Sequence, residues 1–561
     1  MSTRREFELK LGLFERAGRA DGAPRHPLWL IVGASLWMAS AGNLALWREL
    51  AQLGLVQGVR GVAFGLAIGA LLLALLLLLI GLLAWRGTLK PVLTLLLLAS
   101  AVGTHFMFTY GVVLDSSMVT NVLQTHPREV LDLMSARLFI TVVVLGLLPA
   151  IWVWRTPVRN PPWPRQVVHN GALVLGSLAA AAIVLLASFQ PFSSAMRNHR
   201  HLRYLANPLN MVHALGQLAA RPLQRDESIV LPLGEDARLG ASHAAQRRPP
   251  LLVLVVGETG RAGNFALNGY ARPTTPELAA ENVVSYRNAW ACGTSTAAAL
   301  PCMFSHLGRE AFERRGVNHE SLLDVLQRAG LAVLWLDNQS GCKGVCARVP
   351  TQAIVAGDDA LCAGGECFDE VLLHGLDERI AALPPQLRSR GAVIVMHPMG
   401  SHGPAYFKRS PARFKRFLPE CASNILPDCS NAELVNAYDN SIVYTDHVLA
   451  STIRWLKART ASWNSALIYV ADHGESLGEH NLYLHGLPYA VAPDVQKRVP
   501  WITWLAPEFE RRAGITAACL RRGVDARISH DHLFHSVLGL LDVTTSAYRR
   551  ELDVHAECAM P

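Results

Sequence analysis

The chain has 561 residues, of which 51% are hydrophobic, a mean hydropathy of +0.23 and a formal net charge of +8. The apolar residues are bunched in the first 200 positions, which excludes a purely soluble protein. The positive charge collects beside these apolar segments, so we expect no nucleic-acid partner.

Five uncharged stretches are long enough to cross a bilayer, which takes about 17–25 residues. They are residues 27–47, 61–85, 91–114, 138–154 and 166–196. The N-terminal arm and alternate loops are rich in Lys and Arg, which places the N-terminus in the cytoplasm. Five crossings then put everything after about residue 190 outside. A transporter would carry charged residues along its spans. The spans hold only His105 and His169, so transport is disfavoured.

The spans divide the chain into three parts: an N-terminal arm with the five-span domain (1–195), interfacial helices with a polar linker (196–250), and a soluble domain (251–561). Between Arg197 and Pro222, apolar and polar residues alternate at roughly helical spacing. This pattern favours helices on the outer leaflet, and the alternative is a helix packed on the soluble domain. The outer loop 115–136 is longer than a connection needs, and its plainest interpretation is a short amphipathic helix.

From residue 251, apolar strands alternate with helical stretches, which predicts an α/β domain with a largely parallel sheet. The buried strands are residues 251–258, 331–338, 391–397 and 466–473. In such sheets the ligand site lies beyond the carboxyl ends of the strands. The residues at those ends are Glu258, Asn338 to Ser340, His397, Asp472 and His473.

Two carboxylates and one imidazole among these residues predict a divalent metal. Glu258, Asp472 and His473 would suit Zn²⁺ in an open catalytic site, where three protein ligands leave one position free. For Asp472 and His473 alone, the alternative is a helix cap beside a buried histidine.

The stretch ACGTSTAAALPC (291–302) offers three hydroxyls, Thr294, Ser295 and Thr296. A hydroxyl is a poor nucleophile at neutral pH, and metal coordination lowers its pKa. If the loop opens a helix, its N–H groups would favour an anionic phosphate. The alternative is a Ser/Thr helix cap, the commoner use of these residues.

All ten cysteines follow residue 291, an even count in one region, which indicates disulfides in an oxidising compartment. Proximity suggests the pairs Cys292–Cys302, Cys342–Cys346, Cys362–Cys367, Cys421–Cys429 and Cys519–Cys558. Other connectivities stay open, as do metal thiolates and free buried cysteines. A bridge between Cys292 and Cys302 would hold the hydroxyl loop in position.

Five motifs in order resemble the phosphoethanolamine transferases that modify lipid A, including the colistin-resistance type. They are VVGETGRAGNFALNGYARPTTP, ACGTSTAAALPCMFS, DNQSGCKGVC, HPMGSHGPAYFKR and ADHGESLGEHNLYLHG. The resemblance covers nearly the whole chain. It implies an alkaline-phosphatase/sulfatase-like α/β fold for the soluble domain.

The resemblance also implies roles for single residues. The zinc ligands fall on Glu258, Thr296, Asp472 and His473, with Thr296 as nucleophile and Thr294 as a neighbouring site residue. His402 and His485 match histidines that bind the phosphoryl group or a second zinc. Lys343, with Ser340 beside it, matches a basic residue of the acceptor or phosphate pocket. Asn121, Thr125 and Glu129 match contacts to the donor's ethanolamine head. Gln339 departs from the asparagine that family members often have.

The implied enzyme is a monomer in the bacterial inner membrane with its catalytic domain in the periplasm. It would move phosphoethanolamine from phosphatidylethanolamine to a lipid A phosphate through Thr296, and His402 or His485 would carry the proton. The product masks an anionic phosphate, lowering attraction for cationic peptides such as polymyxin. The alternatives are another acceptor such as a core sugar or glucan, phosphoglycerol transfer, and a phosphodiesterase. A sulfatase needs CxPxR or SxPxR, which the hydroxyl loop lacks.

Overall fold

A computed structural model describes residues 24–124, 127–224, 226–244, 247–355 and 359–559. The chain forms two compact units. The helical unit comprises Met1–Asp115 and Met134–Leu215, and the α/β unit comprises Ser116–Leu133 and Gly216–Pro561. The outer loop expected between two spans therefore belongs to the α/β unit.

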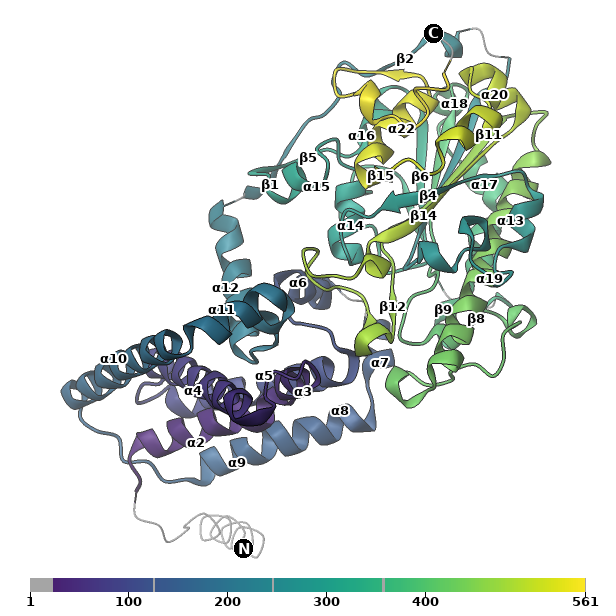
Figure 1. The fold of residues 1–561 in the computed structure, drawn as a ribbon. Coiled ribbons are helices and arrows are strands. Elements are labelled where there is room, and N and C mark those ends of the chain that lie inside the picture. The colour runs from purple at the N-terminus through teal and green to yellow at the C-terminus, as the bar shows by residue number, and fades with distance from the viewer. Residues whose placement is uncertain (1–23, 125–126, 225, 245–246, 356–358, 560–561) are drawn as a thin grey trace, which may run out of the picture. The chain divides into compact units, whose positions relative to one another are not determined.

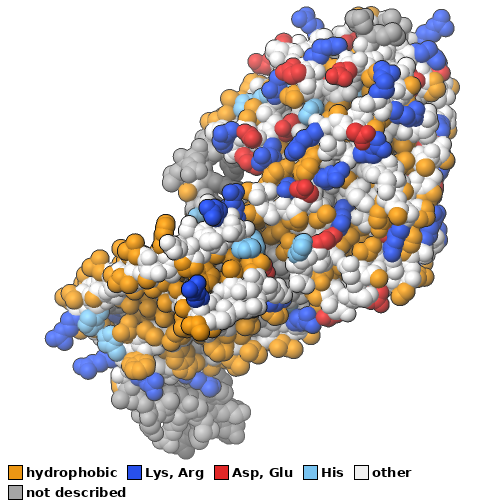
Figure 2. Space-filling view, viewed as in Figure 1, with side chains coloured by type: hydrophobic (Ala, Val, Ile, Leu, Met, Phe, Trp, Pro, Cys, Tyr) orange, Lys and Arg blue, Asp and Glu red, His pale blue; other side chains and the backbone are white. Residues whose placement is uncertain are grey.

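The described part of the helical unit has five helices that are long and apolar enough to cross a membrane, which confirms the predicted number. They are Pro27–Gln52 (α2 Pro27–Ser40, η1 Ala41–Asn43 and α3 Leu44–Gln52), α4 Gly58–Leu83, α5 Leu89–Tyr110, Ala136–Arg155 (α8 Ala136–Thr141, η2 Val142–Leu147 and α9 Leu148–Arg155) and α10 Trp163–Ala187. Figure 2 shows hydrophobic side chains crowded over this unit, as a lipid-facing surface requires.

Two features of the helical unit follow from its sequence. Pro149 is tolerated in the fourth span because it stands in the first turn of α9, directly after the π-helical η2. Near the third span, the buried Asn207 donates to the carbonyl oxygens of Gly42 and Ser100 at 2.8 and 2.7 Å. A polar side chain buried between apolar helices is stable only with such partners.

After the last span come α11 (Phe189–Asn198), η3 (Arg200–Leu205) and α12 (Leu209–Gln224). Pro208 lies just before α12, where a proline does not interrupt the helix, and α12 ends two residues after Pro222. This segment is helical, as expected for residues 196–224.

The α/β unit is built on an eight-stranded sheet with helices on both sides (Figure 1). Its strands, in spatial order, are β15 (Ile528–Ser529), β4 (Val284–Trp290), β14 (Arg498–Leu505), β11 (Asn464–Ala471), β3 (Pro250–Gly257), β10 (Ala392–His397), β6 (Ala332–Asp337) and β7 (Thr351–Ala353). All neighbours pair in parallel except β14, which runs antiparallel to β11 and β4. The largely parallel sheet is confirmed, and its four central predicted strands are β3, β6, β10 and β11.

The order β11-β3-β10-β6 sets the place of the site. The register pairs Ala471 with Gly257 and His397 with Asp337, so the four strands end together at one edge. The long helix α19 (Asn431–Lys457) packs beside β11 and begins with a capping box between Ser430 and Glu433. We call this edge of the sheet the carboxyl edge.

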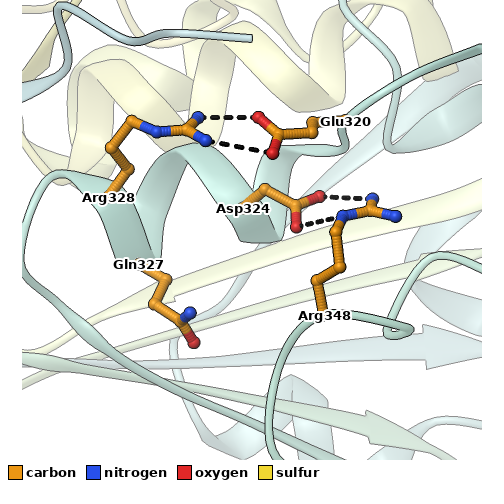
Figure 3. A pocket seen from close by; sticks show the side chains of 5 residues that line it. All are labelled: Glu320, Asp324, Gln327, Arg328 and Arg348. Atoms are coloured by element: carbon orange, nitrogen blue, oxygen red, sulfur yellow. Dashed lines mark hydrogen bonds and ion pairs between the residues drawn. The ribbon is translucent and has the colours of Figure 1, made fainter. Parts of the chain in front are cut away.

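A cavity of about 270 Å³ lies beside α16 (Leu322–Arg328) in the α/β unit (Figure 3). Arg328 pairs with Glu320 and Arg348 with Asp324 along its wall. Arg328 also donates to the carbonyl oxygen of Leu233, and Glu320 accepts the N–H of Leu233 at 2.9 Å. Because carboxylates engage both arginines, the pair Arg328–Glu320 serves to hold Leu233 against α16, within the α/β unit.

Candidate active site and metal centre

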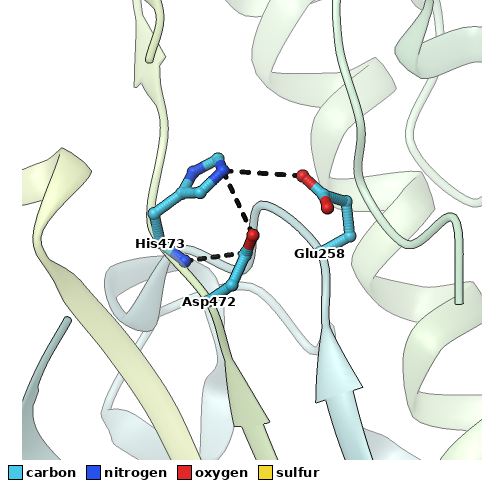
Figure 4. A group of neighbouring side chains, drawn as sticks. All are labelled: Glu258, Asp472 and His473. Atoms are coloured by element: carbon cyan, nitrogen blue, oxygen red, sulfur yellow. Dashed lines mark hydrogen bonds and ion pairs between the residues drawn. The ribbon is translucent and has the colours of Figure 1, made fainter. Parts of the chain in front are cut away.

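Glu258, Asp472 and His473 meet at the carboxyl edge because β3 and β11 are neighbours in register (Figure 4). The Nε2 atom of His473 lies 3.5 Å from Oε1 of Glu258 and 3.4 Å from Oδ2 of Asp472. One ligand atom from each residue lies within 4.8 Å of the others, and all three side chains are buried. The sequence placed these residues at strand ends, and the structure brings them together.

Backbone contacts fix the orientation of this triad. Oδ1 of Asp472 accepts the N–H groups of Thr259 and His473 at 3.0 and 2.7 Å, so Oδ2 faces the other two residues. Within the described part of the chain, that buried Oδ2 has no hydrogen-bond partner. Nδ1 of His473 lies 2.9 Å from the carbonyl oxygen of Gly474, which leaves Nε2 directed at the triad.

The electrostatics of the triad call for a cation. Burial raises the pKa of Glu258 and of Asp472, and the carboxylate of Asp472 adds to the rise at Glu258. Burial and the neighbouring His485 lower the pKa of His473 to about 4, so its imidazole is neutral, the form that ligates metals. Two buried carboxylates, one of them with an unpartnered oxygen, fit a divalent metal, whose charge would offset their burial. The triad therefore has the composition of a site for a divalent metal with three protein ligands.

The hydroxyl loop lies against the triad. Ser295 is the N-cap of α14 (Thr296–Met303), and Thr296 is its first residue. The Thr296 hydroxyl lies 3.1 Å from Oε2 of Glu258 and 3.4 Å from Nε2 of His473. Thr294 instead donates its hydroxyl to the carbonyl oxygen of Leu487 at 2.6 Å. Thr296 is thus the loop hydroxyl that points at the candidate metal centre.

Two devices hold this loop in position. The disulfide Cys292–Cys302 joins the start of the loop to α14. His530 accepts the N–H of Cys292 at Nδ1, 3.0 Å away, and its Nε2 lies 2.9 Å from the carbonyl oxygen of Ala471. Burial lowers the pKa of His530 to about 4, so the neutral ring can accept at one nitrogen and donate at the other. His530 thereby ties the loop to the end of β11, a role that no sequence motif indicated.

The ten cysteines form five disulfides, and these are the pairs that proximity in the sequence suggested. The other four disulfides are Cys342–Cys346, Cys362–Cys367, Cys421–Cys429 and Cys519–Cys558. All five lie in the α/β unit, which indicates that this unit folds in an oxidising compartment.

His485 and His402 lie beside the triad. The ring centroids of His473 and His485 are 4.2 Å apart, and those of His402 and His485 are 6.0 Å apart. Nδ1 of His485 lies 3.2 Å from Glu475, whose other oxygen accepts the Tyr406 hydroxyl at 2.8 Å. Burial lowers the pKa of both imidazoles. The Glu475–Tyr406 support of His485 escaped the sequence analysis.

Lys343 and Ser340 lie together on the loop after β6. The Lys343 ammonium is 3.0 Å from the Ser340 hydroxyl and 3.2 Å from the carbonyl oxygen of Gln124. Gln339 donates its amide to Oε2 of Glu258 at 3.1 Å, so the extra methylene relative to asparagine reaches a triad residue. The departure that the sequence placed near the acceptor thus contacts the candidate metal centre.

His397 ends β10 at the carboxyl edge, yet its side chain is directed elsewhere. Its Nδ1 lies 3.2 Å from Oδ2 of Asp337. Burial would raise the pKa of Asp337, but the bond to His397 lowers it to about 2. His397 and Asp337 thus form a buried ion pair, and His397 does not join the triad.

The outer loop comprises α6 (Ser116–Gln124) and α7 (Pro127–Leu133), both within the α/β unit. Asn121 lies on α6, whose Gln124 carbonyl contacts Lys343. Thr125 lies outside the described residues, as does the side chain of Glu129. Asp132 of α7 pairs with Lys408 and, at 3.2 Å, with Arg409. The loop is therefore docked on the α/β unit by charge.

Arg409 connects this docking to the site. Its side chain is only 2% exposed and also pairs with Glu366 at 3.0 Å. Its Nε donates to the backbone carbonyl of His402 at 2.9 Å. One buried guanidinium thus bonds the outer loop and the segment that carries His402.

Two family models match the chain, and one of them covers the α/β unit with its candidate metal centre and hydroxyl. The sulfatase family matches residues 250–543, and the family described as phosphoethanolamine transferase EptA/EptB matches residues 72–223.

Relatives that match nearly the whole chain identify the family of transferases more closely. The chain is 37% identical over 542 residues to phosphoethanolamine transferase EptA of Escherichia coli (strain K12), covering 94% of this chain and 96% of that protein. It is 36% identical over 536 residues to phosphatidylethanolamine transferase Mcr-1 of Escherichia coli, covering 92% and 95%. The chain belongs to the phosphoethanolamine transferase family, and it is a membrane-bound transferase.

The fold agrees over the same length. The integral membrane protein lipooligosaccharide phosphoethanolamine transferase A (EptA) from Neisseria meningitidis superposes with a TM-score of 0.88 at 34% identity. The match covers 95% of this chain and 99% of that one. Its separate soluble domain gives a TM-score of 0.56 at 40% identity, covering 60% of this chain and 100% of that one. The five spans and the sulfatase-like domain are therefore shared.

Proposed function

We propose that this protein transfers phosphoethanolamine from phosphatidylethanolamine to a phosphate group of lipid A, through a covalent intermediate on Thr296. The protein acts as a zinc-dependent monomer in the bacterial inner membrane, with residues 251–561 as the periplasmic catalytic domain. The observation that carries this proposal is the Thr296 hydroxyl, 3.1 Å from Glu258 and 3.4 Å from His473.

Glu258, Asp472, His473 and the Thr296 hydroxyl would hold the zinc ion. When bound, zinc lowers the pKa of a hydroxyl and neutralises charge on phosphoryl oxygens. The orphaned Oδ2 of Asp472 and the neutral imidazole of His473 support this assignment. His402 and His485 would hold a second ion or the phosphoryl oxygens.

In the first step Oγ1 of Thr296 forms a bond to the phosphorus of phosphatidylethanolamine. The bond from phosphorus to the glycerol oxygen breaks, and diacylglycerol leaves with a proton on that oxygen. His485 or His402 would take up the Thr296 proton and deliver it to the leaving group. Lys343 offsets negative charge on the phosphoryl oxygens.

In the second step an oxygen of a lipid A phosphate attacks the phosphorus of the Thr296 adduct. The bond to Oγ1 breaks, and His485 or His402 passes the proton of the attacking phosphate to the Thr296 hydroxyl. Asn121, Thr125 and Glu129 would bind the cationic ethanolamine head, and the docking of α6 on Lys343 supports that assignment. The product carries an amine over its phosphate, which would confer resistance to polymyxin.

Thr296→Ala tests the proposal in detergent-solubilised full-length protein. We expect the variant to remain folded and to lose transfer to lipid A, because it lacks the nucleophile. Thr296→Ser should restore part of the activity, and Ser295→Ala should keep it, because Ser295 is an N-cap without a side-chain cap bond. Retained transfer in Thr296→Ala would refute the assignment.

A further inference from the structure

A group of cations stacked on two aromatic rings lies in the α/β unit outside the site described above. The Arg527 guanidinium is 4.4 Å from the centre of the Trp290 ring, and that of Arg309 is 4.3 Å from the centre of the Tyr489 ring. The Lys497 ammonium lies between them, 5.5 Å from Tyr489 and 6.0 Å from Trp290. We call these five residues the cation–aromatic cluster.

The sheet places this cluster at the carboxyl edge. Trp290 is the last residue of β4 and pairs with Arg498, the first residue of β14. Because β14 runs antiparallel to both β4 and β11, the end of β4 lies at the same edge as Asp472, which follows β11. The cluster and the triad are therefore on one side of the molecule.

Two short connections join the cluster to the hydroxyl loop. Trp290 precedes Thr296 by six residues, a chain length that spans at most about 20 Å. Tyr489 follows Leu487 by two residues, and the carbonyl oxygen of Leu487 accepts the Thr294 hydroxyl. A substrate that reacts at Thr296 and extends in this direction would meet the cluster.

The cations are held in place by aromatic faces more than by carboxylates. Arg309 forms an ion pair with Glu313 at 3.1 Å, and Lys497 forms one with Asp494 at 3.2 Å; both carboxylates are exposed. Arg527 stacks on Trp290, and within the described part of the chain it forms no ion pair. Surface ion pairs contribute little, so an arriving anion can replace these partners.

Asp531 is a third acid near the cluster, after Glu313 and Asp494. One of its oxygens accepts the backbone N–H of Arg309 at 2.8 Å. Stacking leaves the edge of a guanidinium able to bind a phosphate in two-pronged fashion. The cluster thus offers pre-positioned cations to an anion at the same edge of the sheet as Thr296.

We propose that the cation–aromatic cluster binds a second phosphate group of the acceptor, the one that is not modified in that turnover. This inference rests on the proposed function, and it names the acceptor class as a glycolipid that carries two phosphates. One phosphate would react at Thr296 while the other is held by Arg527, Lys497 and Arg309. Because the two phosphates would be bound at separate places on the protein, such an acceptor would bind more tightly than a lipid with a single phosphate.

The test separates the two half-reactions in the full-length protein. Adduct formation on Thr296 is followed with phosphatidylethanolamine alone, and transfer is followed with lipid A that carries either two phosphates or one. For Arg527→Gln we expect the KM for the two-phosphate acceptor to rise about tenfold or more, because the variant loses one charge-assisted hydrogen bond. The rate of adduct formation and the KM for the one-phosphate acceptor should stay within twofold. Arg527→Lys should recover part of the loss.

Arg511→Gln is the matched control. Arg511 is an exposed arginine on α20 (Pro507–Ala513), which follows the opposite end of β14, and it should change neither acceptor. The inference would be overturned if wild type and Arg527→Gln had equal KM values for the two-phosphate acceptor, or if the variant's KM rose equally for both acceptors. Either result would leave the proposed function standing. If the wild-type protein forms no adduct or modifies neither lipid, the proposed function fails, and this inference fails with it.

Discussion

The carboxylate of Asp132 makes the ion pairs that dock the outer loop. Asp132→Ala would remove the partner of Lys408 and one of the two carboxylate partners of the buried Arg409. A buried charge that loses a partner costs about 2–3 kcal/mol after allowing for its remaining bond to Glu366. That cost corresponds to a roughly 30- to 150-fold shift toward the undocked loop.

Hydrogen exchange of backbone amides measures this shift directly. We expect amides of α7 and of α6 to exchange roughly 30- to 150-fold faster in Asp132→Ala, while amides of β3 and β11 are unchanged, because opening is local. Asp132→Asn keeps the shape and one acceptor and should show a smaller change. Glu508→Ala, which removes only an exposed ion pair with Arg511, is the control. Unchanged exchange in α7, or equal acceleration in the central strands, would refute the argument.

Three further predictions concern the site and its supports. Removal of metal with a chelator should lower the melting temperature of the full-length protein, and Zn²⁺ should restore it, because a ligand that binds the folded state stabilises it; the absence of any shift would count against the metal centre. Reduction should lower that temperature as well, since the Cys519–Cys558 bridge alone closes 39 residues and restricts the unfolded chain by about 4 kcal/mol; an unchanged melting curve after verified reduction would contradict this. Gln339→Asn should weaken zinc affinity about tenfold, because the shorter amide loses its bond to Glu258; equal affinity measured by competition with a zinc indicator would show that the contact is dispensable.

Much of the architecture follows from local sequence patterns. Four continuous apolar runs predicted β3, β6, β10 and β11, and the rule that ligands bind at carboxyl ends drew attention to Glu258, Asp472 and His473. β14 lacks a clean pattern because Pro500 interrupts it, and the structure accommodates that proline at an irregularity of register between Val499 and Trp501. β4 alternates between buried and half-exposed residues and gives a weak signal.

Long-range contacts explain what the residues alone left open. Choosing among Thr294, Ser295 and Thr296 requires the bond from Thr294 to Leu487, which lies 193 residues away. His397 stands at a strand end like the triad residues, but only the fold reveals its bond to Asp337. His530 supports the site from a distant segment, so no local spacing could identify it. Glu475 stands only two residues after His473, but its bond to Tyr406 is a long-range contact that only the fold reveals.

The central claim is the covalent intermediate on Thr296. Mass spectrometry of the peptide that holds Thr296, after incubation of the purified full-length protein with phosphatidylethanolamine and no acceptor, tests it most directly. The account predicts a phosphoethanolamine group on Thr296 and none in Thr296→Ala. An unmodified Thr296 peptide with the donor lipid consumed would contradict it and indicate direct hydrolysis.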